Sequence, residues 1–215
     1  MMRTASLVAA IAVLAVAWLG PLTNLASHSF AAHMTMHIAV VAVAAPLLAL
    51  GMAGTGADPV RALPHVVAPI PASMVELVVV WAWHVPALHH AARQETAAFV
   101  LEQGSFIVSG VLLWMAAIGG NHEQRRLRAG SGIVALLFTS MHMTLLGALF
   151  ALANRPLFEH LPSVGASTAV TDQQLGGVIM LLVGGASYLL GGLGLTAVAL
   201  RSRSAAAVGA QRTTG

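Results

Sequence analysis

The sequence predicts an all-α protein, a polytopic bundle of about six transmembrane helices, and two features of the chain lead to this prediction. Of its 215 residues, 58% are apolar and only 8% are charged, whereas an average soluble domain is about 25% charged. The apolar residues also form runs of about 20, the length at which a helix crosses about 30 Å of hydrocarbon. The chain therefore has too little charge to cover a soluble globule of its size.

Proline, glycine and polar residues separate the apolar segments. We predict spans at about residues 4–20, 31–53, 68–87, 96–119, 130–153 and 172–200. Together they form one membrane domain, residues 1–200. The polar, alanine-rich residues 201–215 are expected to be a disordered cytoplasmic tail.

The first span has a second interpretation. Arg3 followed by a short apolar stretch is also typical of a signal peptide. The segment Asn24-Leu25-Ala26 is a poor cleavage site, because asparagine stands where a small residue is expected. Cleavage would leave five spans with the same orientation.

The arginines predict the orientation, because cytoplasmic segments of membrane proteins carry an excess of positive charge. If the N-terminus is cytoplasmic, the inner segments hold eight of the ten arginines, and the outer segments hold only Arg93 and Arg155. We therefore expect both termini in the cytoplasm. So few arginines form no basic face for nucleic acid, and no nucleic-acid partner is expected.

The ten histidines outnumber the seven acidic residues. In the predicted orientation only His65 and His122 lie on the cytoplasmic side. The other eight lie in the outer half of a span or in an outer loop: His28, His33, His37, His84, His89, His90, His142 and His160.

The spacing of these histidines indicates a metal site. His33 and His37 are four residues apart, so both imidazoles lie on one helix face, and Met34 borders that face. His142 stands between Met141 and Met143. Imidazole suits copper, zinc and iron, whereas thioether sulfur selects for Cu(I). Because the chain has no cysteine, this set predicts copper, with His84 of the third span as a further ligand.

Each of these residues also has a structural interpretation. A histidine in a membrane helix is often a hydrogen-bonded helix contact, and methionines commonly fill cores. Asp172 opens the last predicted span, where it suits a helix N-cap, or it faces the histidines as an extra ligand or partner. Glu102 and Gln103 lie near the outer end of the fourth span, where Gln103 is a candidate for the same polar cluster.

Two other functions remain open. Histidines on different helices are also what a membrane b-haem electron carrier needs. A copper transporter would need polar residues through the inner half of the bundle, where only Glu76 lies. The chain has no nucleotide-binding or hydrolytic motif, so we expect no enzyme activity.

Five segments in register resemble the CtaG family of cytochrome c oxidase assembly proteins, the caa3-type group. They are His33-Met34-Thr35-Met36-His37, Trp83-His84-Val85-Pro86, Leu101-Glu102-Gln103-Gly104, His142 with Leu146-Gly147-Ala148, and Asp172-Gln173-Gln174-Leu175-Gly176-Gly177. The resemblance covers about residues 30–195. Three positions depart from the family pattern: Gln103 stands where a histidine is usual, His89 where a tyrosine is common, and Phe158 where a tyrosine is usual.

The resemblance implies a multi-pass protein of the bacterial inner membrane. It would contact a haem–copper oxidase subunit and support the insertion of copper into that oxidase. We expect a Cu(I) site that opens toward the periplasm, formed by His33, His37, His84, His142, Asp172 and Met34.

Overall fold

The computed structural model describes residues 1–158 and 166–213, with side chains up to Arg201 except at residue 166. These residues form helices and no strand. Five helical segments are long and apolar enough to cross a membrane, or six if the bent pair α6 and α7 is one span. This confirms the predicted helical membrane bundle. The helices that form the spans are α1 (Met2–Leu19), α3 (Phe30–Ile38) continued by η1 (Ala39–Ala44) and α4 (Ala45–Met52), α6 (Pro69–Trp83) with α7 (Pro86–Gln94), α8 (Thr96–Ile118), α9 (His122–Ala151), and α10 (Ala166–Ile179) continued by η2 (Met180–Gly184) and α11 (Gly185–Thr213).

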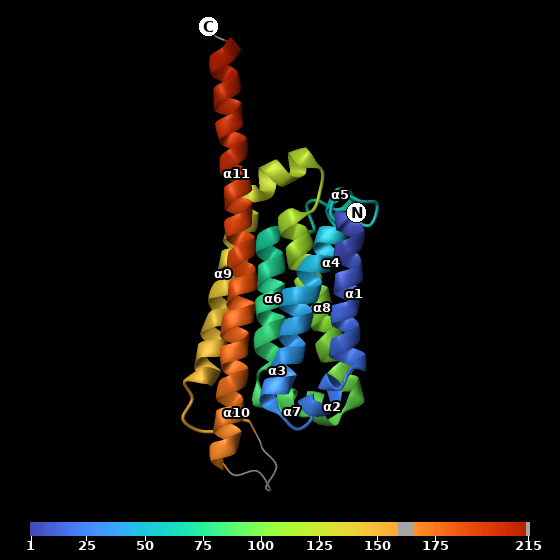
Figure 1. Cartoon of the computed structure of the whole chain (residues 1–215), viewed down its shortest axis with the longest axis vertical. Helices are drawn as coiled ribbons and strands as arrows, with labels where there is room; N and C mark the ends of the chain where they lie inside the picture. Colours follow the sequence, from blue (N-terminus) through green and yellow to red (C-terminus); the bar gives the residue numbers. More distant parts are fainter. Residues whose placement is uncertain (159–165, 214–215) are drawn as a thin grey trace.

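The spans run alternately up and down (Figure 1), so that α1 begins and α11 ends at the same end of the bundle. The short helix α5 (Pro59–Ala62) lies at this end, which we call the inner end after the predicted orientation. The short helix α2 (Leu22–Ala26) and α7 lie at the opposite, outer end. The membrane orientation, the domain boundary near residue 200 and the character of the tail remain predictions.

The predicted third span is interrupted. α6 ends at Trp83, and α7 leaves it at an angle of 74°. Val85 has extended backbone, as a residue before a proline prefers, and Pro86 begins α7. With 15 residues, α6 is only about 22 Å long. Consequently α6 stops short of the outer end, with His84 at its C-cap, and α7 lies across that end of the bundle (Figure 1).

The fifth span begins at His122 rather than near residue 130. Asn121 and Gln124 form a capping box, in which each side chain hydrogen-bonds the other residue's backbone N–H. Asp58 joins this turn to the α4–α6 connection, because its carboxylate accepts hydrogen bonds from the N–H groups of both Gly54 (2.6 Å) and Gly120 (2.7 Å).

The second span contains a π-helical segment, η1, next to Pro46. The N–H of Ala45 bonds to the carbonyl of Val40, five residues back, so the carbonyl of Val41 is left without its usual partner. Pro46 has no N–H, so the carbonyl of Ala42 is left free as well. The break therefore exposes two adjacent backbone acceptors inside the bundle.

Side chains from α11 bind these two acceptors. Ser187 donates to the Ala42 carbonyl (2.6 Å), and Tyr188 lies 3.1 Å from the Val41 carbonyl. The Tyr188 hydroxyl also contacts the carboxyl group of Glu76 on α6. A hydroxyl has one proton, so both contacts are hydrogen bonds at once only if Glu76 is protonated and donates to Tyr188. A neutral Glu76 suits its fully buried position.

Replacing Tyr188 with phenylalanine is expected to destabilise the protein by about 1–3 kcal/mol, because the substitution leaves the Glu76 carboxyl group and a backbone carbonyl unpaired. The measurement is the thermal midpoint of the purified protein in detergent. The double variant Glu76→Leu/Tyr188→Phe should lose less than the sum of the two single variants, since the side chains share one hydrogen bond. A Tyr188→Phe protein as stable as the wild type would contradict this arrangement.

Candidate metal centre

His33 and His37 lie on the same face of α3, as their spacing predicts. Their ring centroids are 4.2 Å apart, and both side chains are buried. The first turn of α3 is held by Ser29, whose side chain accepts from the N–H of Ala32. The two imidazoles therefore occupy defined positions near the outer end of the bundle.

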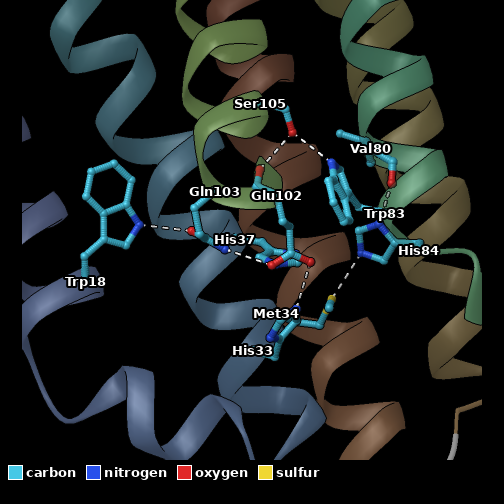
Figure 2. Close-up of polar contacts among 10 residues, drawn as sticks. All are labelled: Trp18, His33, Met34, His37, Val80, Trp83, His84, Glu102, Gln103 and Ser105. Atoms are coloured by element: carbon cyan, nitrogen blue, oxygen red, sulfur yellow. Dashed lines mark hydrogen bonds and ion pairs between the residues drawn. The ribbon is translucent and has the colours of Figure 1, made fainter. Parts of the chain in front are cut away.

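Glu102 faces this pair from α8 (Figure 2). Its Oε1 lies 3.2 Å from His33 Nε2, and its Oε2 lies 3.1 Å from His37 Nε2. Glu102 is completely buried. One potential ligand atom from each of the three residues lies within 4.8 Å of the others, a spacing that a bound ion can close to about 2 Å. Two imidazoles and a carboxylate are a donor set that zinc, iron and copper accept.

A second layer of hydrogen bonds positions Glu102. The amide of Gln103 donates to Glu102 Oε2 at 3.2 Å, and its oxygen accepts from Trp18 Nε1 on α1 at 3.0 Å. Ser105 bonds to the backbone carbonyl of Glu102 and accepts from Trp83 Nε1. Gln103 thus belongs to the polar cluster, as the sequence predicts, where it orients the carboxylate.

His84 approaches the same region from the end of α6. Its Nδ1 lies 2.6 Å from the Val80 carbonyl, and its Nε2 lies 3.3 Å from the Met34 sulfur (Figure 2). The His84 ring is 5.7 Å from the His37 ring, centroid to centroid. The interruption of the third span brings His84 here, because His84 is the C-cap residue that follows the end of α6.

A small cavity of about 10 Å³ adjoins these side chains, which is room for about one water-sized particle. Its lining includes His37 and His84 together with three methionines: Met34, Met143 and Met180. Two imidazoles and three thioethers are donors of the kind that a small, soft ion accepts.

The structure does not bring His142 to this cluster. His142 is buried on α9, and its ring packs against Phe138 of the same helix. The neighbouring residue Met143, rather than His142, lines the cavity. The role of His142 as a ligand remains a prediction. His160, placed in an outer loop by the sequence, lies outside the described residues.

Asp172 does not open the last span, because α10 already begins at Ala166. Its carboxylate instead holds the N-terminus of α3. It accepts from the Ser29 hydroxyl (2.7 Å) and from the N–H groups of Phe30 (2.6 Å) and Ala31 (3.3 Å). Both carboxylate oxygens of Asp172 accept hydrogen bonds in this contact. The contact fixes the N-terminus of α3 and, one turn further along, the position of His33. Metal ligation by Asp172 remains a prediction.

Comparison with known proteins supports the resemblance seen in the sequence. Residues 1–202 match the family described as cytochrome c oxidase caa3 assembly factor, Caa3_CtaG. The chain belongs to this family. The family describes proteins of oxidase assembly, so an oxidase is the partner that it implies. Neither the curated proteins nor the solved structures gave a significant match.

Two residues of this Caa3_CtaG member were not among the predicted ligands. Glu102 was recognised only as a polar residue of the fourth span, although a carboxylate within a membrane segment is itself a signal of function. His89 was expected in an outer loop. It lies instead on α7, buried, with its ring 4.8 Å from that of His33.

Replacing Trp18 with phenylalanine is expected to lower the thermal midpoint, because the Gln103 oxygen loses its donor inside the bundle. The cost should be about 1 kcal/mol. Trp81→Phe is the matched control, since Trp81 is also partly buried but its indole nitrogen has no hydrogen-bond partner among the described residues. Equal effects of the two substitutions would show that the Trp18–Gln103 hydrogen bond contributes little.

Proposed function

We propose that this protein binds Cu(I) near the outer end of the bundle and supports the insertion of copper into cytochrome c oxidase. The contact between His84 and Met34 is the observation that carries the proposal. The Val80 carbonyl can only accept a hydrogen bond, so in a neutral imidazole the proton of His84 is on Nδ1. Nε2 then presents a lone pair to the Met34 sulfur, which has no proton to donate. A soft cation between these two donors would satisfy both.

The surrounding groups favour Cu(I) over a harder ion. Thioether sulfur is a ligand that selects Cu(I), and three methionines line the cavity beside His37 and His84. His37 lines this cavity and lies 3.1 Å from Glu102, whose other carboxylate oxygen faces His33. The carboxylate supplies one negative charge, so that a monovalent cation at the centre would leave the site neutral overall. Neutrality favours binding in a medium of low dielectric constant.

The position of the site supports transfer toward the outer side of the membrane. His33 lines a larger cavity of about 210 Å³, together with residues of α2, of α7 and of the start of α8. These elements lie at the end opposite to the one where α1 begins (Figure 1). Most arginines belong to the segments at the inner end, where α1 begins, and the positive-inside rule assigns this end to the cytoplasm. In a bacterial inner membrane the metal would therefore face the periplasm.

The two alternatives have less support. Haem needs room for a macrocycle between its axial imidazoles, whereas the rings of His33, His37 and His84 lie within 4.2–5.7 Å of their neighbours. A transporter needs polar groups through the inner half of the bundle. There the buried carboxyl group of Glu76 is already bonded to Tyr188. Docking and delivery of copper fit this arrangement better than passage through the bundle.

The first prediction of this proposal concerns Cu(I) affinity, measured under reducing conditions by competition with a chromophoric chelator. The double variant His33→Ala/His37→Ala is expected to abolish binding. Met34→Leu should weaken Cu(I) binding more than about tenfold. Losing even a residue that only hydrogen-bonds a metal ligand lowers metal affinity about 10–100-fold.

Met141→Leu is the matched control for the methionine substitution, because Met141 is 60% exposed on α9 and should bind Cu(I) as the wild type does. Unchanged affinity of Met34→Leu would remove the soft-ligand argument. Zinc that displaces Cu(I) at equal concentration, or a haem bound to the purified protein, would contradict the assignment of the metal.

The second prediction concerns cells. Cells without this protein should assemble an oxidase that is present in the membrane but deficient in copper. His84→Ala at a normal membrane level should give the same defect, because the Met34–His84 pair is then lost. Excess copper should partly restore activity, since mass action can replace a delivery factor. Full oxidase activity of the His84→Ala strain in copper-limited medium would show that the site is not the source of the metal.

A further inference from the structure

His89 is a buried imidazole that no hydrogen bond in the described structure accounts for. Only 2% of its surface is exposed, and neither ring nitrogen has a partner. Leaving such a group unpaired inside a protein costs free energy. A ligand that binds imidazole, such as a metal ion, would supply the partner that the His89 ring nitrogens lack.

The fold brings His89 to the site by the same break that positions His84. α7 begins at Pro86 and lies across the outer end of the bundle, with His89 and Ala92 on its buried side. The ring of His89 packs between the rings of Phe30 (5.5 Å between centroids) and Phe158 (4.3 Å), with its third ring contact to His33. Packing against these aromatic rings fixes the position of the imidazole and leaves its nitrogen atoms unbonded.

Four imidazoles therefore form a continuous row. The ring of His89 is 4.8 Å from that of His33, which is 4.2 Å from that of His37, and His84 follows at 5.7 Å. The row leads from α7 at the outer end, across α3, to the Met34–His84 pair. Within the row, ligand atoms of His33 and His37 lie within 4.8 Å of each other, so an ion bound to one of these imidazoles lies close to the next.

The row begins beside the larger cavity. His33 and Ala92, one turn beyond His89 on α7, both line this space of about 210 Å³. His33 lines this cavity, whereas His37, His84 and His89 are not among its lining residues, so His33 is the first imidazole of the row that an ion entering here would meet. His89 is the imidazole next to that first ligand.

We propose that His89 is a second ligand at the entry to the site, beside His33. A Cu(I) ion is first held by His89 and His33, and it then exchanges His89 for His37 and finally reaches His84 and Met34. Every step is an exchange of neutral ligands: a nitrogen–copper bond forms as another breaks, the last step also forms the sulfur–copper bond to Met34 as a histidine leaves, and the oxidation state of copper does not change. This inference rests on the proposed Cu(I) site, but it concerns the rate of loading rather than the final affinity.

The test is the rate at which the purified full-length protein in detergent takes up Cu(I) from a chromophoric chelator, followed by stopped-flow absorbance without oxygen. His89→Phe keeps an aromatic ring between Phe30 and Phe158 but has no nitrogen atom. It is expected to slow uptake at least about tenfold while the amount of copper bound at equilibrium stays the same. His90→Phe is the control, since His90 is exposed on the same helix, and its uptake should match that of the wild type.

A second variant separates ligation from packing. His89→Met has a soft ligand but no aromatic ring, so it should load at nearly the wild-type rate. If His89 served only to pack against Phe30 and Phe158, the Phe variant would load normally and the Met variant would have the lower thermal midpoint. Wild-type loading by His89→Phe would overturn the entry role and leave the Cu(I) site standing. A wild-type protein that binds no Cu(I) would overturn both.

Discussion

The buried carboxylate of Glu102 places the strongest constraint on this bundle. A charge can be buried in a membrane protein only where other groups pair with it. Glu102 therefore requires α8 to face α3, where His33 and His37 lie within about 3 Å of its oxygens. Gln103 extends the same network to Trp18 on α1. The neighbouring side chains of Glu102 and Gln103 thus hold α8 in register with α1 and α3, from which it is distant in the sequence.

Breaks in regular helix provide the other polar positions. Pro46 and the π segment leave two carbonyls for Ser187 and Tyr188 of α11. The Val85-Pro86 break ends α6 at Trp83, with His84 as its C-cap, and turns α7 over the outer end. Helix distortions often lie at functional sites, because a regular helix uses its backbone groups internally. In this protein the distortions lie immediately beside the candidate ligands.

Most helices of the bundle can be predicted from the sequence. The reason is that the length of an apolar run is a local property, which can be compared directly with the thickness of a membrane. The 3.6-residue period likewise places His33 and His37 on one face. The third span is the exception. Its composition is mainly apolar, but Pro86 favours an extended residue before it. A segment long enough to cross the membrane therefore divides into the short helix α6 and the bent helix α7.

The composition and spacing of the chain by themselves determine that it is a helical membrane protein with a paired imidazole motif in its second span. Only the tertiary structure decides what meets that motif. It brings Glu102 and His84 to the pair and folds His89 over His33. It also places Asp172 on the N-terminus of α3 and leaves His142 against Phe138. The physical reason is that the face of a helix follows from its own sequence, whereas its rotation against its neighbours depends on side-chain packing over the whole bundle.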